Sequence, residues 1–378
     1  MMRDAVLEAV GAVTDPELRR PLGELDMIRD VVVEDGIASV GILLTIAGCP
    51  MAQRIERDVA EAAATVDGVR EVRVEVGVMS DEQRAALTER LRGGHRATTN
   101  PFTAESLTRV VAVTSGKGGV GKSTVTANLA VALAERGLAV GVLDADVHGF
   151  SIPGLLGLVG DDGRAVRPTR VDDLVLPPVA YGVKAVSIGM FLRPGAEDTV
   201  VSWRGPMLHR TLEQFLADVF FGDLDVLLID MPPGTGDAAI SVGHLLPHAD
   251  VLVVTTPQPA AADVAVRSGL LARQLGQRVV GVVETMGPGA LPDGSVFEPF
   301  GAGGGDAVAR RLAVAGGEAP AVTGIPFSTA LRASGDEGRP VVVAHPEDAA
   351  AQALAGLAAR IAVRPRGLAG RRLAFSPR

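Results

Sequence analysis

The chain has a single cysteine, Cys49, among its 378 residues. One cysteine excludes an internal disulfide, and it excludes any zinc site or iron–sulfur cluster held by several cysteines of one copy. Long apolar runs are absent as well, since Gly, Pro or a charged residue interrupts each run well short of a membrane span. The N-terminus lacks a basic region followed by an apolar one, so we expect no signal peptide and a cytoplasmic protein.

Lysine is the second scarce residue. Only three of the 36 basic residues are lysines, and two of them, Lys117 and Lys122, lie in one glycine-rich loop. Lysine is a slim point donor, whereas arginine carries a wide planar fork. A loop that closes tightly around phosphates has room for the first and little for the second. The placement of the two lysines therefore indicates a steric demand for lysine in this loop.

The net charge of −9 is spread unevenly along the chain. Residues 1–92 hold 18 acidic residues and 11 arginines, whereas residues 363–378 hold five arginines and no acid. We interpret residues 364–378 as a solvated basic tail. A patch for nucleic acid or a membrane surface is the alternative, but five spaced charges give it little support. We therefore expect neither nucleic acid nor a membrane among the partners.

Residues 1–92 have the pattern of a small α+β domain. The Asp35-Gly36 pair predicts a hairpin turn between two strands. The helices are expected at residues 4–13 and 51–66, and the strands at residues 30–34, 37–44 and 69–76. Residues 93–108 form a polar linker with little periodicity, and residues 109–363 form a second, larger domain.

The second domain alternates short β-branched runs with helical stretches. Strands are expected at residues 110–114, 139–143, 183–188, 226–229, 251–255, 279–283 and 321–325, and helices at residues 123–136, 207–220, 263–275 and 306–313. This alternation predicts an α/β fold with a mostly parallel sheet covered by helices on both faces. Such sheets bind ligands beyond the carboxyl ends of their strands.

A phosphate-binding loop follows the first of these strands. Its sequence satisfies the Walker A pattern in the required strand–loop–helix context. Its glycines allow the backbone amides to point at an anion, and the helix N-terminus adds its dipole. The predicted ATP-binding residues are Gly116, Lys117, Gly118, Gly119, Val120, Gly121, Lys122, Ser123 and Thr124. Lys122 is expected to reach the β- and γ-phosphates, and Ser123 to bind Mg²⁺.

Three acidic residues stand at the ends of two predicted strands. Asp144 and Asp146 follow residues 139–143, and Asp230 follows residues 226–229. Asp230 fits the role of a Walker B residue that holds Mg²⁺, Asp144 would support the metal shell, and Asp146 would position the attacking water. Helix capping is the alternative for Asp144 and Asp146. Residues 232–236, Pro-Pro-Gly-Thr-Gly, predict a loop that responds to the γ-phosphate.

Several segments resemble one family of ATPases. The resemblance lies in residues 15–18, 45–50, 114–124, 143–147, 151–153, 203–207, 229–237, 256–258 and 281–284. It is to the Mrp/ApbC iron–sulfur cluster carrier ATPases, of the group that includes MinD, ParA and nitrogenase iron protein. The N-terminal domain is similar to one found in iron–sulfur assembly proteins. The Trp203-Arg-Gly-Pro segment separates this family from the partition and division ATPases.

The resemblance implies a homodimer that binds and hydrolyses ATP, carries a labile cluster and hands it to apoproteins or assembly factors. The early Lys117 gives the loop its deviant form, in which that lysine reaches the partner's nucleotide. A solvated lysine at the loop edge is the alternative reading of Lys117. The alternative function is a nucleotide-switched scaffold of the ParA/MinD kind that binds a partner and carries no cluster.

Two departures from the family pattern bear on the predicted cluster and base sites. Residues 286–300 lack the Cys-x-x-Cys that most members carry there, so a thiolate-bridged cluster at that position is impossible. Thr285 stands where an Asn commonly helps to recognise adenine, and a hydroxyl offers less than an amide's paired donor and acceptor. The remaining thiol, Cys49, precedes a predicted helix whose dipole would lower its pKa, which favours a reactive thiolate or cluster ligand. A small buried residue is the alternative reading of Cys49.

Overall fold

A computed structural model of the chain describes residues 2–46, 49, 51–92, 100–146, 149–191, 205–290, 293, 295–314 and 318–362. Of the segments singled out above, Trp203, most of the linker and the basic tail at residues 364–378 lie outside the described residues. The described chain divides into two compact units. No helix within these ranges has both the length and the apolar character needed to cross a membrane.

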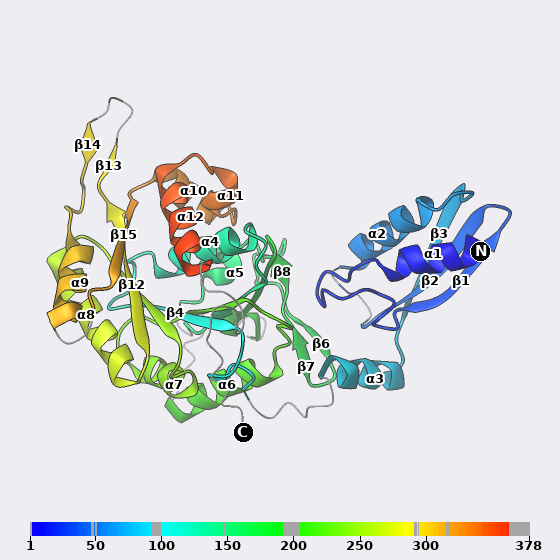
Figure 1. Cartoon of the computed structure of the whole chain (residues 1–378), viewed down its shortest axis with the longest axis horizontal. Coiled ribbons are helices and arrows are strands. Elements are labelled where there is room, and N and C mark those ends of the chain that lie inside the picture. The colour runs from blue at the N-terminus through cyan, green and yellow to red at the C-terminus, as the bar shows by residue number, and fades with distance from the viewer. Residues whose placement is uncertain are drawn as a thin grey trace, which may run out of the picture. The chain divides into compact units, whose positions relative to one another are not determined.

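Unit 1 is built around a three-stranded sheet with strand order β1-β2-β3. Its N-terminal elements are α1 (Met2–Gly11), β1 (Ile28–Glu34), β2 (Ile37–Leu44), α2 (Ala52–Ala64), β3 (Glu71–Val78) and α3 (Asp81–Arg92). Strands β1 and β2 pair antiparallel around Asp35 and Gly36, which both have positive φ, and β3 pairs parallel to β2. The predicted small α+β domain is therefore confirmed, with α3 as an additional helix (Figure 1).

Unit 1 also takes in two segments that come after the phosphate loop in sequence, Pro168–Val179 and Ala217–Gly222. The first forms an antiparallel hairpin of β6 (Thr169–Val171) and β7 (Leu174–Leu176). Its apolar residues Val171, Leu174 and Leu176 are buried in the same core as the sheet residues of the N-terminal domain. Unit 1 is thus assembled from three stretches of the chain, and the predicted domain boundaries at residues 92 and 108 stay a prediction.

Unit 2 contains an eight-stranded sheet of order β15-β12-β11-β4-β10-β5-β9-β8. Its strands are β4 (Arg109–Ser115), β5 (Val140–Asp144), β8 (Val179–Ala180), β9 (Val183–Ser187), β10 (Val226–Asp230), β11 (Asp250–Thr255), β12 (Arg278–Gly287) and β15 (Ala321–Pro326). The seven strands from β15 to β9 pair parallel with one another. The predicted mostly parallel α/β sheet is confirmed, with each predicted strand in place.

The helices of unit 2 cover both faces of this sheet. They are α4 (Lys122–Ala134), α5 (Ile152–Leu155), α6 (Gly205–Asp218), α7 (Asp237–Leu245), α8 (Pro259–Gln274), α9 (Gly304–Val314), α10 (Thr329–Asp336), α11 (Val341–Ala344) and α12 (Ala349–Ala362), with a 3₁₀ turn at Ile188–Phe191. A short hairpin of β13 (Gly289–Ala290) and β14 (Val296–Phe297) follows β12.

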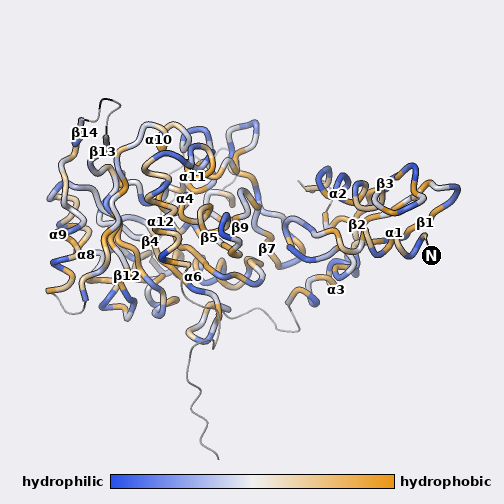
Figure 2. Tube along the Cα trace, turned by 45° about the horizontal axis from the view of Figure 1, so that its top comes forward, coloured by the Kyte–Doolittle hydropathy of each residue, from blue (hydrophilic) through white to orange (hydrophobic). Residues whose placement is uncertain are grey.

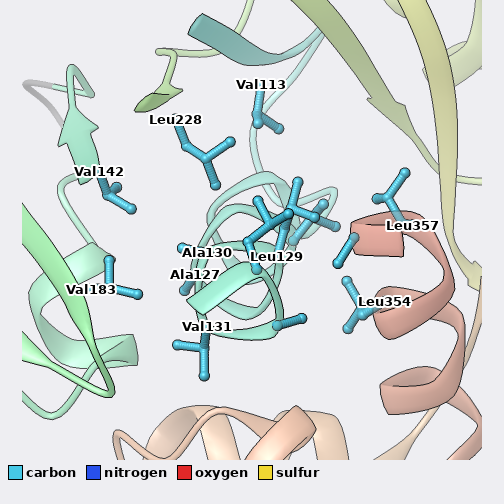
Figure 3. Close-up of a cluster of buried hydrophobic side chains, with 14 of the residues drawn as sticks. Val113, Ala127, Leu129, Ala130, Val131, Val142, Val183, Leu228, Leu354 and Leu357 are labelled. Carbon is cyan, nitrogen blue, oxygen red and sulfur yellow. The ribbon is translucent and has the colours of Figure 1, made fainter. Parts of the chain in front are cut away.

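Helix α4 is the most deeply buried helix of unit 2. Figure 3 shows it between strand residues such as Val113 and Leu228 on one side and Leu354 and Leu357 of α12 on the other. Because side chains alternate along β4, Ala112 points to the opposite face, where α7 and α8 pack. The apolar character of the central strands around β4 and β12 is visible in Figure 2. The phosphate loop therefore joins a strand and a helix that are both held rigidly in the core.

Candidate nucleotide site

The phosphate loop runs from the end of β4 at Ser115 to the start of α4 at Lys122. Gly119 and Gly121 have φ of 77° and 78°, a left-handed conformation that side-chain-bearing residues rarely adopt. At Gly116 a Cβ atom would overlap the backbone of Val264 and Ala265 in α8, so only glycine fits there. The glycine pattern read from the sequence thus has two physical causes, backbone conformation and close packing against α8.

A cavity of about 490 Å³ lies against this loop. Its wall contains the loop residues Lys117, Gly118, Gly119, Gly121, Lys122, Ser123 and Thr124, together with Ser115, Asp146, Gly149, Ser151, Pro232 and Pro233. The loop after β10 is tied to the phosphate loop, because the Gly234 amide donates to the Ser115 carbonyl at 2.7 Å. The structure therefore brings the predicted phosphate loop, Asp146 and the predicted γ-phosphate loop to one cavity.

The Lys122 ammonium group lies among acidic and hydroxyl oxygens at the base of the loop. Its Nζ atom is 2.6 Å from Asp230 Oδ2 and 3.6 Å from Asp146 Oδ2, and it donates to Ser123 Oγ at 3.1 Å. The Lys122 side chain is only 6 % exposed, so these contacts hold a buried positive charge. Charge-assisted hydrogen bonds of this kind are the strong ones, and they fix Lys122 next to the cavity.

Asp230 is fully buried and accepts hydrogen bonds from two hydroxyls of α4. Ser123 Oγ donates to Asp230 Oδ2 at 2.6 Å, and Thr126 Oγ1 donates to Asp230 Oδ1 at 2.7 Å. Thr126 was not expected from the sequence. Thr126 lies three residues after Ser123, so both hydroxyls are on one face of α4. This spacing is the sequence signal by which Thr126 could have been predicted.

Asp144 lies beside Asp230 in the sheet, because the two end β5 and β10 in register. Asp144 Oδ2 accepts from Ser187 Oγ at 3.0 Å, and Oδ1 accepts from the Asp146 amide at 3.1 Å. Burial and, to a lesser degree, the negative charge of Asp230 raise the pKa of Asp144 to about 8. Ser187 is a second supporting residue that the sequence pattern does not reveal, since only the strand order places β9 beside β5.

Lys117 differs from Lys122 in its surroundings. The residue is exposed, and the described part of the chain offers its side chain no hydrogen bond or ion pair. Its carbonyl accepts from the Ser115 hydroxyl at 3.0 Å, which shapes the loop. Lys117 therefore lines the cavity with a cation that is unpaired among the described residues.

A second, more apolar cavity of about 220 Å³ adjoins the phosphate loop and shares Gly121 and Thr124 with the first. Thr285 and Phe327 lie in its wall. The Thr285 hydroxyl lies 2.6 Å from the Val120 carbonyl oxygen and 3.1 Å from that of Thr255, and it donates to these atoms. Thr285 thus holds the phosphate loop in place from the wall of the second cavity, and its predicted contact with the base stays a prediction.

Two family models match the chain. Residues 106–362 match a model described as NUBPL iron-transfer P-loop NTPase, and residues 3–76 match one described as iron-sulfur cluster assembly protein. The first match alone covers more than half of the chain. The chain belongs to the iron–sulfur cluster carrier family of P-loop NTPases.

Relatives from different bacteria align with nearly the whole length of this carrier. An iron-sulfur cluster carrier protein of Mycobacterium tuberculosis (strain ATCC 25618 / H37Rv) is 53 % identical over 99 % of this chain and 96 % of its own length. One from Synechocystis sp. is 41 % identical over 95 % of this chain and 96 % of its own. Among solved structures, an ADP complex of a nucleotide-binding protein from Archaeoglobus fulgidus is 35 % identical with a TM-score of 0.51, covering 63 % of this chain and 92 % of that one. The resemblance drawn from the motifs is confirmed.

This carrier has hairpin β13–β14 in the stretch where the resemblance places paired cysteines. Cys49 lies in unit 1 instead, 7 % exposed and in contact with that unit's apolar core. Burial, with smaller effects of the charges of Glu17 and Asp15, raises the pKa of the Cys49 thiol to about 11. The prediction that the start of α2 lowers the pKa of Cys49 is therefore wrong. The amides of Met51 and Ala52 do lower this pKa, but burial raises it by more.

Mg²⁺ fits the oxygen donors of the first cavity. Ser123 lies in the cavity wall and its Oγ donates to Oδ2 of Asp230, which is fully buried behind the wall, and Asp146 also lines the cavity. No group of three or more His, Cys, Asp or Glu side chains that would hold a metal ion occurs among the described residues. Mg²⁺ commonly takes one or two protein oxygens and completes its shell with water and phosphate, so this sparse donor set suits it.

The raised pKa of Asp144 predicts a pH-dependent effect of replacing it. Because the folded carboxyl holds its proton up to about pH 8 and an unfolded one only to about 4, the nucleotide-free protein loses stability as pH rises between these values. Asp144→Asn stays neutral and escapes this loss. We therefore expect the free energy of unfolding of Asp144→Asn, minus that of the wild type, to increase by a few kcal/mol from about pH 5 to about pH 9. Urea unfolding without Mg²⁺ or nucleotide measures this difference.

Asp161→Asn removes a negative charge at an exposed position and is the matched control. Its free energy of unfolding should differ little from that of the wild type at both pH values. If the free energies of unfolding of Asp144→Asn and wild type differ by the same amount at both pH values, the pKa of Asp144 is not raised in the folded state.

Proposed function

We propose that this chain binds Mg–ATP at the phosphate loop, hydrolyses it, and couples the cycle to carrying an iron–sulfur cluster to apoproteins. The observation that carries the ATPase part is the pair Lys122 and Ser123 in the wall of the 490 Å³ cavity, hydrogen-bonded to the fully buried Asp230 behind them. A cation, a hydroxyl and a carboxylate there match the needs of a triphosphate and its metal ion. Family membership supports the carrier part.

In this proposal, different residues around the cavity bind the phosphates, hold Mg²⁺ and position the attacking water. The amides of residues 116–124 and Lys122 would bind the phosphates, while Ser123 and Asp230, with Asp144 behind them, would hold Mg²⁺. Bound Mg²⁺ would neutralise developing charge on the phosphate oxygens. Asp146, 8 % exposed at the cavity wall, would hydrogen-bond an attacking water. Catalysis of this kind depends on positioning and electrostatics, with no covalent intermediate on the protein.

The adjoining apolar cavity is our candidate for the base. Its wall combines Phe327 and Leu331 with the end of the phosphate loop at Gly121 and Thr124. An aromatic and aliphatic wall suits the faces of a purine. The Thr285 hydroxyl already donates to backbone carbonyls. Any hydrogen bond that distinguishes adenine from other bases would therefore come from the lone pairs of this hydroxyl or from neighbouring backbone groups.

A second copy of the chain completes the site in this proposal. Lys117 is exposed at the cavity, and its side chain makes no hydrogen bond or ion pair with the described residues of its own chain. A lysine that reaches into the partner's site would add positive charge where charge develops during hydrolysis. A C₂ dimer would use each Lys117 once and give two equivalent sites.

The cluster is cargo, and one chain offers it one thiolate, Cys49. A thiolate is the form that binds iron, and the raised pKa of Cys49 makes its buried thiol a weak ligand at neutral pH. Two copies supply two thiolates, so the remaining ligands would come from small molecules or from the recipient apoprotein. Such an arrangement favours a labile cluster that is easily passed on. A cytoplasmic location stays a prediction.

Reconstitution with iron and sulfide under anaerobic conditions tests the cargo. We expect the wild-type protein to gain bound iron and the visible charge-transfer absorbance, and Cys49→Ser to lose most of both. Met51→Leu conserves volume beside the thiol and serves as the matched control, which should load like wild type. Equal loading of Cys49→Ser and wild type would show that Cys49 is not a ligand.

A single thiol per chain also favours a second candidate, a nucleotide-switched scaffold that binds a protein partner without cargo. In that case the wild-type protein gains no iron in the same experiment, while ATP hydrolysis persists. Reconstitution therefore separates the two candidates independently of the nucleotide site.

A further inference from the structure

Thr126 lies one turn inside helix α4, and its side chain is fully buried and does not belong to the wall of the nucleotide cavity. Thr126 Oγ1 lies 2.7 Å from Asp230 Oδ1 and 3.0 Å from the Lys122 carbonyl oxygen. A threonine hydroxyl carries one proton, and a carboxylate is a stronger acceptor than a backbone carbonyl, so this proton goes to Asp230. Thr126 is thus a donor to Asp230 that a nucleotide in the cavity would not contact.

The two oxygens of the Asp230 carboxylate have different partners. Oδ2 lies 2.6 Å from Lys122 Nζ and accepts from Ser123 Oγ at 2.6 Å, and both of these residues line the cavity. Oδ1 accepts from Thr126, which is the side-chain donor that the described residues offer to this oxygen. The carboxylate is therefore held with one oxygen toward cavity-lining residues and the other toward the buried face of α4.

The partners of Oδ2 are needed for nucleotide and Mg²⁺, whereas the partner of Oδ1 is not. In the proposed function, Lys122 binds the phosphates and Ser123 binds Mg²⁺, so both weaken their hydrogen bonds to Asp230. Thr126 has no such second partner to serve. Helix α4 is packed in the core of unit 2 through neighbours such as Val125, so the Thr126 hydroxyl is held on a rigid element. Its hydrogen bond therefore keeps the orientation of Asp230 in the loaded site.

We propose that Thr126 is a positioning residue that sets the Mg²⁺ affinity of the nucleotide site by fixing the carboxylate of Asp230. This role rests on the proposed nucleotide function and adds to it a residue outside the cavity wall. Without the Thr126 hydroxyl, the buried Oδ1 loses its side-chain donor, and the carboxylate rotates toward the donors that remain. Oδ2 then no longer keeps its place beside Ser123, the proposed Mg²⁺ ligand. The amides of the phosphate loop do not depend on this contact, so binding of the phosphates themselves is spared.

Thr126→Val removes the hydroxyl and conserves the shape of the side chain. Binding of a fluorescent, non-hydrolysable ATP analogue to the full chain, titrated with Mg²⁺, measures the effect. We expect the Mg²⁺ concentration that gives half of the Mg²⁺-dependent increase in binding to rise about tenfold or more, as when a support of a metal ligand is removed. Binding of the same analogue in EDTA should stay close to that of the wild type. Thr126→Ser keeps the hydroxyl and should restore the wild-type Mg²⁺ requirement, although it lacks the methyl group.

Thr88→Val is the matched control. Thr88 lies on α3, is 6 % exposed and donates to Asp172 Oδ2 at 3.4 Å, so this variant removes a similar helical hydroxyl from a carboxylate of unit 1. Its Mg²⁺ requirement should equal that of the wild type. If Thr126→Val does not fold, Thr126→Ala carries the same predictions.

Four results would overturn the role of Thr126: an unchanged Mg²⁺ requirement in Thr126→Val, an equal loss of binding in EDTA, no restoration by Thr126→Ser, or the same shift in Thr88→Val. A wild-type protein that binds no nucleotide, or binds it equally with and without Mg²⁺, would instead overturn the proposed Mg–ATP site.

Discussion

Lys122→Ala is expected to lower ATP turnover by about a thousandfold or more, because in the proposed site it removes the cation that binds the transferred phosphate. The same change leaves Asp230 fully buried without its counter-ion, with the hydroxyls of Ser123 and Thr126 as its remaining side-chain donors among the described residues. Breaking a buried pair in this way costs about 3–5 kcal/mol. Phosphate release and urea unfolding measure the two effects.

Lys122→Arg separates catalysis from folding. Arginine keeps a positive charge beside Asp230, so the loss of stability should be much smaller than for Lys122→Ala. Its wide fork does not fit the narrow loop, so turnover should remain low. Normal turnover in either variant would mean that the 490 Å³ cavity is not the site of hydrolysis.

Lys117→Ala is expected to abolish hydrolysis while sparing nucleotide binding and stability. Lys117 is exposed, and its side chain makes no hydrogen bond or ion pair within the described residues, so its removal should change the free energy of unfolding by no more than about 0.5 kcal/mol. In the proposed dimer, its loss removes only the charge offered to the partner's nucleotide. Equilibrium binding of a fluorescent ATP analogue and phosphate release, measured on the same sample, distinguish the two effects.

The control for this prediction is Arg136→Ala, which removes an exposed cation at the C-terminal end of α4, away from the cavity, and should leave turnover unchanged. Full turnover of Lys117→Ala at concentrations where the protein is monomeric would contradict the role of a second copy.

The parts of the fold that the sequence predicted are those specified locally. The strands β4, β10 and β11 are continuous apolar runs, and the phosphate loop has a fixed spacing of glycines and lysine. Helix α3 escaped prediction because it is mostly polar, with Leu87 and Leu91 as its buried apolar contacts. The hairpin β6–β7 has strands of three residues and gains its stability from a core built largely by residues far away in sequence, which no local pattern reveals.

The same distinction holds for the candidate site. The sequence identifies Lys122, Ser123 and Asp230 because each sits at a fixed place relative to a strand or helix end. The supporting hydroxyl of Ser187 depends on strand order, and the hydrogen bond of Thr285 to Val120 depends on a contact between distant segments. The pKa of Cys49 was predicted in the wrong direction since burial, a tertiary property, exceeds the effect of the nearby helix end.

Mixing two inactive variants tests most directly the central claim, that two copies build each ATP site. In a mixed dimer of Lys117→Ala with Lys122→Ala, the first subunit keeps its own Lys122 and receives an intact Lys117 from its partner. One of its two sites is therefore complete. Random exchange of subunits should restore about one quarter of wild-type turnover, although each variant alone is inactive. If the mixture stays as inactive as its components after exchange is verified, the two lysines act within one chain and the two-copy site is wrong.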